Sequence, residues 1–289
     1  MKILVTGASG FIGTHLMKYL KEKKHIVHGI SRTSNTKNIT AISLSNLPKL
    51  GRIFEKNRYD VVVHLAATIY NENLMDVFKN NCKSTFDLLD ICRKNNVSKV
   101  IFASTHMVYG NSKYLPINED HPLNPATNYA ISKIIGESIC KMFFNLFGLN
   151  TTILRISSVY GKGQPPSLVI PMMIRNMLEN KKLVLHKYRN GFQIMDLINV
   201  DDVCKAIELA ARKDTGFKTY NISSGTPITV EHIARELSKI SNCSIEIKNI
   251  PRETNHFLYD ISLAKKQLGF KPATKLNKNT LSEFMKNMN

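Results

Sequence analysis

The sequence predicts an α/β fold, a Rossmann-like doubly wound parallel sheet with a smaller C-terminal lobe. Strand and helix patterns alternate from Met1 to about Ile156, and this alternation gives parallel strands joined by right-handed helical crossovers. A glycine-rich turn joins the first strand to the first helix, as in many folds of this class. The length of 289 residues is enough to bury one large core and to add a lobe beside it.

Short apolar runs predict the strands of this sheet. Helices cover both faces of a parallel sheet, so its strands are apolar throughout. The first strand is Lys2–Thr6, and a helical pattern follows from Phe11 to about Lys21. In all, six strands are expected to begin near Lys2, His25, Thr40, Val61, Lys99 and Thr151.

The second half of the chain is less regular. The glycine- and proline-rich segment 161–166 breaks the pattern and opens the lobe. The segment 200–211 is expected to return to the main sheet. From Thr226 onward we expect two or three helices and a short strand near Ile245.

Three glycines spaced three residues apart follow the first strand. Glycine tolerates the backbone angles of a tight turn and lets the main chain approach a pyrophosphate, while the helix N-terminus supplies N–H groups to that anion. A tight turn without a ligand is the alternative interpretation. The cofactor-binding residues predicted in the turn are Gly7, Ser9, Gly10, Phe11, Ile12 and Gly13.

The end of the second strand selects the cofactor. A carboxylate there binds the ribose 2′-hydroxyl of NAD, whereas an arginine accommodates the 2′-phosphate of NADP. This chain has Ser31 and Arg32 and no acidic residue nearby. We therefore expect NADP rather than NAD, with a solvated loop position for Arg32 as the alternative.

A tyrosine and a lysine four residues apart are the candidate proton-transfer pair. The spacing occurs at Tyr19/Lys23, Tyr109/Lys113 and Tyr129/Lys133. Only Tyr129 opens a long helical pattern, and residues four apart on a helix are neighbours. A nearby ammonium lowers the pKa of a phenol, so Tyr129 could move a proton to or from a carbonyl or alcohol oxygen. The alternative is a packed tyrosine beside a solvated lysine.

The fifth strand ends in hydroxyl groups. Thr105 stands at the carboxyl end of the run that begins at Lys99, and ligands of such folds bind at the carboxyl ends of parallel strands. Thr105 is therefore expected to orient the reacting oxygen, with Ser104 as the second choice and a capping role as the alternative.

Composition limits the partners. The formal net charge is +18 and the isoelectric point is about 9.7, which favours anionic substrates. The lysines are scattered and match no nucleic-acid motif, so no nucleic-acid partner is expected. The apolar run 61–67 is too short to cross a membrane. The five cysteines form no spaced cluster and the histidines show no metal-ligand spacing, so a cytoplasmic protein without a metal is expected.

The chain resembles the extended short-chain dehydrogenases/reductases, the NAD(P)-dependent nucleotide-sugar epimerase/dehydratase/reductase family. The resemblance covers nearly the whole chain and rests on seven groups of residues in order. They are Thr6-Gly7-x-x-Gly10-x-x-Gly13, Asp60 to Ala67 with Asn81 and Thr85, Ser104-Thr105-x-x-Val108-Tyr109-Gly110, Tyr129-x-x-x-Lys133, Leu154-Arg155 with Val159-Tyr160-Gly161, Val200-Asp201-Asp202-Val203, and Tyr220-Asn221-Ile222.

The resemblance implies roles for these residues. Thr105, Tyr129 and Lys133 form the catalytic trio, and Lys133 also binds the nicotinamide ribose. Residues 1–160, with about 190–212 returning, form the dinucleotide-binding domain, and 161–289 mainly the substrate-binding lobe. The resemblance also implies a homodimer. Further cofactor-binding residues are Leu65, Ala66, Ala67 and Asn81, and the substrate-binding candidates are Ser104, His106, Ser158, Arg175 and Arg252.

Departures from the family pattern narrow the reaction. Sugar-nucleotide dehydratases carry Asp-Glu after the catalytic threonine, where this chain has His106 and Met107. Many members have an arginine on the substrate phosphates where this chain has Met195, and Arg252, Arg175 or Arg189 could replace it. These departures favour NADP-dependent reduction of a nucleotide-activated 4-keto sugar. The short chain, as in family members that reduce 4-keto-6-deoxy sugars, favours a 6-deoxy sugar. The alternatives are an NAD-dependent nucleotide-sugar 4-epimerase and a dinucleotide-sensing protein without catalysis.

Overall fold

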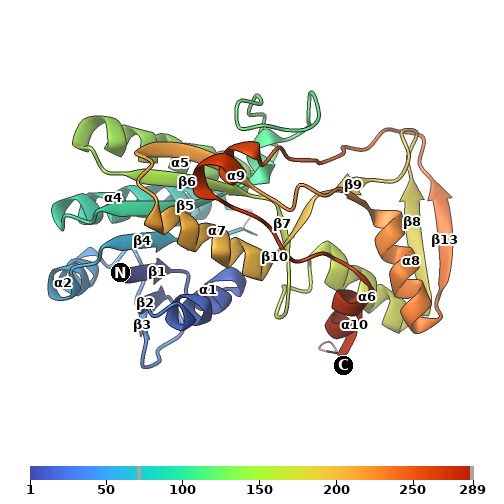
Figure 1. Cartoon of the computed structure of the whole chain (residues 1–289), viewed down its shortest axis with the longest axis horizontal. Helices are drawn as coiled ribbons and strands as arrows, with labels where there is room; N and C mark the ends of the chain where they lie inside the picture. The colour runs from blue at the N-terminus through green and yellow to red at the C-terminus, as the bar shows by residue number, and fades with distance from the viewer. Residues whose placement is uncertain (70–72, 287–289) are drawn as a thin grey trace.

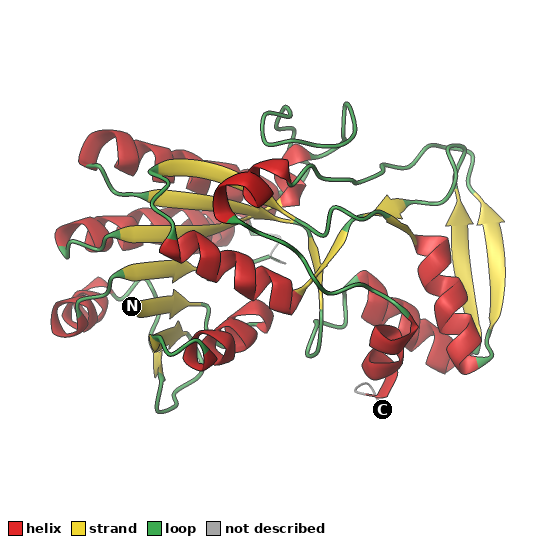
Figure 2. Ribbon diagram, in the orientation of Figure 1, coloured by secondary structure: helices red, strands yellow, loops and turns green. Residues whose placement is uncertain are grey.

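The computed structural model describes residues 1–69 and 73–286. A seven-stranded sheet forms the larger part of the molecule, and helices pack on both of its faces (Figures 1 and 2). A smaller lobe lies beside the carboxyl ends of the strands. Among the described residues, no helix is both long and apolar enough to cross a membrane.

The main sheet is parallel throughout, in the order β11-β6-β5-β4-β1-β2-β3. All six predicted strands are confirmed. The main sheet also contains a seventh strand, β11, which follows the segment 190–212 in the sequence. The strands are β1 (Lys2–Thr6), β2 (Ile26–Ser31), β3 (Ile39–Ala41), β4 (Val61–His64), β5 (Lys99–Thr105), β6 (Thr151–Ile156) and β11 (Phe217–Ile222). The chain winds in opposite directions from β1, so a crevice opens between the carboxyl ends of β1 and β4.

Alternate residues of each strand face different helix layers. Ile3 and Val5 pack against α1, α7 and α9, whereas Leu4 packs on the other face against α2, α4 and α5. This follows from the two-residue repeat of a strand. One layer contains α1 (Phe11–Glu22), α7 (Val200–Arg212) and α9 (Ser262–Leu268); the other contains α2 (Leu47–Asn57), α4 (Ser84–Lys94) and α5 (Asn128–Phe147).

Three short elements connect these layers to the crevice. The helical stretch before α4 consists of α3 (Leu74–Val77) and a π-helical segment, η1 (Phe78–Lys83). A 3₁₀-helix, η2 (His106–Tyr109), follows β5 directly and begins at the cap Thr105. Irregular helical turns of this kind occur often at functional sites.

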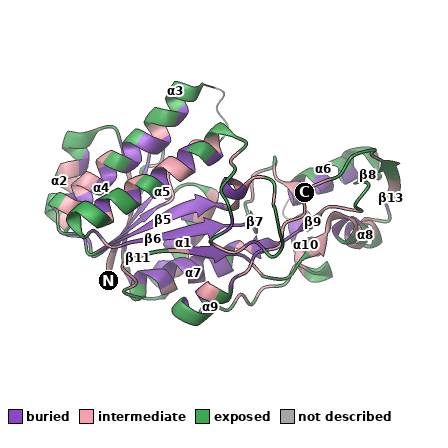
Figure 3. Cartoon of the chain, turned by 90° about the horizontal axis from the view of Figure 1, so that it is seen from above, coloured by how far each residue is buried: buried purple, intermediate pink, exposed green. Residues whose placement is uncertain are grey.

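The smaller lobe has its own apolar core and three two-stranded sheets (Figure 3). Its helices are α6 (Val169–Asn180), α8 (Val230–Ser241) and α10 (Lys278–Lys286). Helices α8, α9 and α10 and strand β13 fulfil the expectation for the segment after Thr226. The sheets pair β8 (Lys182–Lys187) with β13 (Ser244–Asn249), β7 (Ser158–Tyr160) with β10 (Leu197–Asn199), and β9 (Ile194–Met195) with β12 (Ile228–Thr229).

Candidate active site

A cavity of about 980 Å³ lies at the carboxyl ends of the main-sheet strands and extends to the lobe. It collects most of the predicted site residues. From the cofactor set it is lined by Gly7, Ser9, Gly10, Phe11, Ile12, Gly13, Ser31, Arg32, Leu65, Ala66 and Ala67, and from the catalytic and substrate sets by Ser104, Thr105, His106, Tyr129, Lys133 and Ser158.

The glycine turn forms one wall of this cavity. A Cβ atom at Gly13 would lie 2.1 Å from the Gly7 carbonyl oxygen, and Gly7 itself has φ +70°, so both positions require glycine. Helix α1 begins at Gly10 without a side-chain cap. Its first N–H groups therefore face the cavity as an anion site, which fits the pyrophosphate of a dinucleotide.

The end of β2 carries hydroxyl groups instead of a carboxylate. The Ser31 hydroxyl is 2.6 Å from that of Ser9 and accepts hydrogen bonds from the N–H groups of Thr33 and Ser34. Arg32 is exposed and lines the same end of the cavity. These groups can hydrogen-bond a ribose hydroxyl, but without a carboxylate they offer no strong discrimination against a 2′-phosphate.

Thr105 and Lys133 are fixed at the carboxyl end of β5. The Thr105 hydroxyl accepts a hydrogen bond from the Met107 N–H at 3.2 Å. The Lys133 ammonium donates to the Ala103 carbonyl at 2.7 Å and lies 5.7 Å from the centre of the Tyr129 ring. Burial lowers the pKa of Lys133 to about 8. A threonine hydroxyl, a phenol and a partly desolvated ammonium thus face one cavity, a set suited to proton transfer at an alcohol or carbonyl oxygen.

Asn81 lies behind the cavity wall and is not among its lining residues. Its amide exchanges hydrogen bonds with the backbone of Thr68 and donates to the Ser132 hydroxyl, which in turn donates to the Tyr129 carbonyl. Asn81 therefore ties η1 to the first turn of α5. This arrangement holds the elements of the site together from behind the cavity wall.

A buried histidine below the glycine turn was not predicted as a site residue. His64 lies between the hydroxyls of Thr6 and Thr85, at 2.7 Å and 3.0 Å. Burial, followed by the charge of Lys133, lowers the pKa of His64 to about 3. The Thr6 hydroxyl also accepts from the Ala66 N–H. The Thr85 hydroxyl donates to the Asn81 carbonyl, so it must accept from Nε2 of His64. Nδ1 then accepts from the Thr6 hydroxyl, and His64 is the neutral Nε2–H tautomer.

His106 lines the cavity with both ring nitrogens engaged. Nδ1 lies 2.8 Å from the Tyr259 hydroxyl and Nε2 lies 3.3 Å from the Ser158 hydroxyl. Burial lowers the pKa of His106 to about 4. A neutral imidazole with both nitrogens hydrogen-bonded, next to the apolar Met107, is a poor substitute for the acid–base pair that an elimination needs.

Three predicted substrate-binding side chains are placed differently. The Ser104 hydroxyl donates to the carboxylate of Glu137 at 2.5 Å, so it is directed into the protein. Arg175 donates to the Pro166 carbonyl, and Arg252 is exposed; neither lines the cavity. Arg252 lies beside Arg189, whose N–H donates to the Arg252 carbonyl. Both arginines belong to loops of the lobe, where the sequence pattern did not fix a position.

The lobe contributes lining residues that sequence analysis missed. Gln164 lines the cavity, and its Oε1 is buried with no hydrogen-bond partner among the described residues. A buried acceptor without a donor is costly in a protein, so this atom suits a hydroxyl group of a ligand. The sequence feature that could have indicated Gln164 is its position as a polar residue in the glycine- and proline-rich segment 161–166. Other lining residues from the lobe are Leu168, Met195 and Leu197.

Comparison with known proteins identifies the family. The model of the "NAD dependent epimerase/dehydratase family" matches residues 3–223, most of the chain. The chain belongs to the NAD dependent epimerase/dehydratase family. The resemblance found in the sequence, the fold class and the assignment as an NAD(P)-dependent enzyme of the extended short-chain dehydrogenase/reductase type are thus confirmed.

Members of the family resemble the chain over its full length. A provisionally named UDP-glucose 4-epimerase of Methanocaldococcus jannaschii is 32% identical over 99% of both chains. The structure of the Thermotoga maritima UDP-glucose 4-epimerase with UDP-glucose has a TM-score of 0.88 and 30% identity and covers 100% of both chains. The Bacillus cereus UDP-glucuronic acid 4-epimerase with UDP-glucuronic acid and NAD has a TM-score of 0.86 and 27% identity, also over 100% of both chains.

Proposed function

We propose that the protein is an NAD-dependent 4-epimerase of UDP-activated hexoses. The observation that carries the proposal is the placement of Thr105, Tyr129 and Lys133 on one cavity with the uncapped glycine turn. The full-length relatives named as 4-epimerases support the same reaction. The departures in sequence favour a reductase, but the comparisons lend that interpretation no support.

The catalytic residues act on the C4 oxygen of the sugar. The glycine turn and Lys133 would hold NAD, which would supply reversible hydride transfer at C4. Tyr129 would remove the C4 hydroxyl proton and later restore it, while the Thr105 hydroxyl holds the same oxygen. The Lys133 ammonium favours the phenolate form of Tyr129 because opposite charges attract. Inversion at C4 requires that the keto sugar turn over between the two transfers, so that the hydride returns to its other face.

The residues at the other positions favour hydride return over elimination. A dehydratase needs a proton donor and a base near C5 and C6 of the sugar. The side chains next to Thr105 are the neutral His106 and the apolar Met107, which cannot supply that pair. The unpaired Gln164 acceptor and the Ser158 hydroxyl offer hydrogen bonds to sugar hydroxyls instead.

We propose NAD rather than NADP as the cofactor, because structures of similar enzymes were determined with NAD. The cavity supports this cofactor through the glycine turn, the end of β4 at Leu65 and Ala66, and Lys133 at the nicotinamide ribose. The prediction of NADP rested on Ser31 and Arg32. Their hydroxyl and guanidinium groups do not exclude NAD, since hydroxyls can hydrogen-bond a ribose diol.

The proposed assembly is a homodimer formed through α4 and α5. Large apolar side chains remain exposed along these adjacent helices, namely Phe86, Ile131, Met142, Leu146 and Phe147. Several large exposed apolar side chains on one pair of neighbouring helices are typical of an interaction surface. Leu146→Glu should yield a monomer by light scattering, whereas Leu178→Glu, at an exposed leucine of α6, should not. A monomeric wild type at micromolar concentration contradicts the assembly.

The function is tested with purified protein and no added cofactor. UDP-glucose and UDP-glucuronic acid are each incubated with the protein, and the 4-epimer is detected by proton NMR. Nucleotide extracted from the protein should be NAD. Tyr129→Phe should retain the nucleotide but lose turnover by about 10²- to 10⁴-fold. Consumption of added NADPH with a 4-keto sugar, without epimerisation, would overturn the proposal in favour of reduction.

A further inference from the structure

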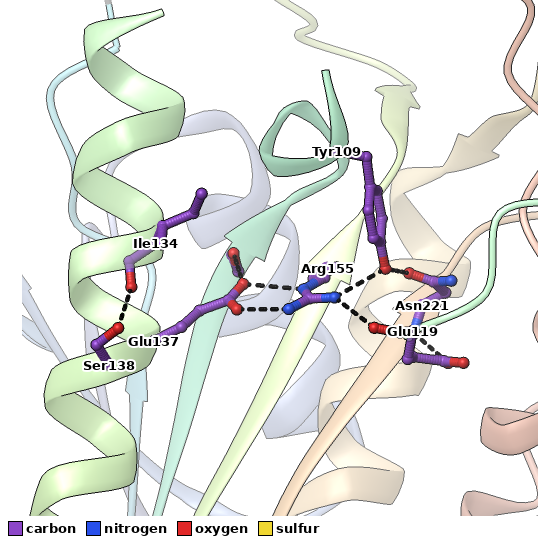
Figure 4. A network of polar contacts seen from close by, with 8 residues as sticks. Tyr109, Glu119, Ile134, Glu137, Ser138, Arg155 and Asn221 are labelled. Carbon is purple, nitrogen blue, oxygen red and sulfur yellow. Dashed lines mark hydrogen bonds and ion pairs between the residues drawn. The ribbon is translucent and has the colours of Figure 1, made fainter. Parts of the chain in front are cut away.

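A buried ion pair connects α5 to the neighbouring strands (Figure 4). Glu137 of α5 and Arg155 of β6 are 7% and 8% exposed. Arg155 donates from Nε to Oε1 of Glu137 at 3.1 Å and from Nη2 to Oε2 at 2.8 Å. Oε1 also accepts the Ser104 hydroxyl of β5 at 2.5 Å. The carboxylate therefore holds two strands against the catalytic helix with three hydrogen bonds.

The remaining guanidinium nitrogen extends the network to β11. Arg155 Nη1 donates to the Tyr109 hydroxyl at 3.1 Å and to the Glu119 carbonyl at 2.9 Å. Tyr109 donates to the Asn221 amide oxygen at 2.6 Å, and the Asn221 N–H donates to the Glu119 carboxylate at 2.7 Å. These hydrogen bonds link β6, η2, β11 and the loop that contains Glu119 (Figure 4). A shift of α5 relative to the strands would break several of them at once.

The location of this network relates it to catalysis. Ser104 immediately precedes Thr105, and Glu137 lies one helical turn beyond Lys133, which itself lies one turn beyond Tyr129. A buried ion pair seldom adds net stability over an apolar pair of equal volume, and in some proteins it specifies one arrangement of the chain. Here the ion pair joins α5 to β6, and its carboxylate also accepts the Ser104 hydroxyl of β5.

We propose that Glu137 is a positioning residue for epimerisation: by holding Ser104 and Arg155, it fixes the distance between Thr105 on β5 and the Tyr129–Lys133 pair on α5. This inference rests on the proposed function. Thr105 and Tyr129 must contact the same substrate oxygen, so a change of one ångström in their spacing reduces the rate strongly. Glu137 does not line the cavity and acts only through its neighbours.

The charge of Glu137 also acts on Lys133. The groups facing Lys133 are Glu137, Cys140 and Tyr129 of α5, Cys82 of η1 and His64 of β4. Burial lowers the pKa of Lys133, and the charge of the Glu137 carboxylate partly opposes this. His64 and the thiols remain neutral near pH 7, since burial holds the pKa of His64 at about 3 and raises the pKa of Cys82 and Cys140. Glu137 is therefore the anionic group that keeps Lys133 protonated.

The test compares three substitutions on α5. Glu137→Gln removes the charge and turns an amide toward Arg155, whereas Glu137→Asp keeps the charge. Ser138→Ala is the matched control, since Ser138 is exposed and its hydroxyl, within the described part of the chain, donates to the Ile134 carbonyl of its own helix (Figure 4). Glu137→Gln should lower kcat at least about tenfold with KM within about threefold. It should also move the alkaline decline of activity to lower pH, because the pKa of Lys133 falls further.

Rescue distinguishes positioning from a general loss of structure. In Glu137→Asp, the pH of the alkaline decline should return to the wild-type value and kcat should be partly restored. Ser138→Ala should match the wild type in both quantities. The content of bound NAD and the far-ultraviolet circular dichroism of each variant report whether it is folded. If Glu137→Gln does not fold, Ser104→Ala removes the Ser104–Glu137 hydrogen bond and leaves the Glu137–Arg155 pair and the Lys133–Ala103 hydrogen bond in place. This variant should still lower kcat with KM unchanged.

Failure of the proposed function and failure of the role of Glu137 give different results. A wild type that does not epimerise any UDP-hexose refutes the proposed function. A wild type that does epimerise, with a folded Glu137→Gln variant that keeps its kcat and pH profile, refutes the role of Glu137. The role is also refuted if Ser138→Ala impairs turnover as much as Glu137→Gln.

Discussion

Two buried lysines with lowered pKa values lie at opposite ends of strand β5. Lys99 begins β5 at its amino end and donates hydrogen bonds to the Lys213 carbonyl and the Thr215 hydroxyl. Lys133 of α5 packs against the carboxyl end of the same strand and donates to the Ala103 carbonyl. Burial lowers the pKa of both to about 8.

Their surroundings distinguish a structural lysine, Lys99, from the lysine that we propose to be catalytic, Lys133. Lys99 is not among the residues lining the large cavity, whereas Lys133 faces it together with Tyr129 and Thr105. A shifted pKa therefore marks burial at both positions, and only the place in the topology marks function. In a parallel sheet the carboxyl ends of the strands form the ligand crevice, and the amino ends do not.

The largest effect expected from this difference is on turnover. Lys133→Met removes the ammonium beside the Tyr129 phenol and should reduce kcat by about 10²- to 10⁴-fold. Lys99→Met should leave kcat within about threefold, because its ammonium bonds only the segment after α7. Initial rates of epimerisation at pH 7.5 measure both. Equal losses of kcat in two folded variants would erase the distinction between the two ends of the sheet.

The sequence could predict those parts of the site that lie within one element or one turn. The glycine turn and the pair Tyr129/Lys133 depend on residues close together along the chain, so their spacing is visible without the fold. The contact of Lys133 with the Ala103 carbonyl and the link from Glu137 to Arg155 join different elements. No pattern within one element reports such pairings, so they emerged only from the folded chain.

The substrate side was less predictable for a related reason. Its lining comes from three small sheets and the loops between them, whose strands are too short to show a repeat. Arg175 and Arg252 are plausible phosphate ligands by residue type, but the structure places neither on the cavity wall. Gln164 was missed because a single polar residue in a loop has no periodic context. The proposal of an epimerase rather than a reductase likewise rests on the comparison with relatives.

A second expected effect concerns acid stability at the carboxyl end of the sheet. His64 and His106 have folded pKa values of about 3 and about 4, below the unfolded value of 6.5. The unfolded chain therefore binds more protons as pH falls through 6.5, and stability is lost. From pH 7 to pH 5, about 1.5 pH units below the unfolded pKa, each histidine should cost about 2 kcal/mol.

Denaturant titrations at pH 7 and pH 5 measure this loss. His106→Asn should show a pH dependence smaller by about 2 kcal/mol, since one of the two protonation differences is gone. His232→Asn, at an exposed histidine of α8, is the matched control and should behave as the wild type. An undiminished acid loss in His106→Asn would mean that this imidazole is not held neutral.

A third effect, of about tenfold, concerns the cofactor at the carboxyl end of β2. Ser31→Asp supplies a carboxylate for the ribose 2′-hydroxyl and repels a 2′-phosphate. Because a hydrogen bond to a charged group contributes about 1.5–3 kcal/mol, the ratio of NAD to NADP affinity should rise at least about tenfold. Dissociation constants of both nucleotides for protein freed of its cofactor measure it. A ratio that does not change would place the adenosine ribose away from β2.

The smallest effect is the pH at which activity declines. The cationic fraction of Lys133 falls to about half at pH 8, because its pKa is about 8, so kcat should fall about twofold there relative to pH 7. Lys99 titrates in the same range, and a pH profile of the wild type alone cannot assign the decline. In Lys99→Met the decline should stay where it is, since the titrating group that matters faces the cavity. If the decline disappears in Lys99→Met, the titrating group that controls turnover lies at the amino end of β5. That result would contradict the assignment of the decline to Lys133 at the carboxyl end.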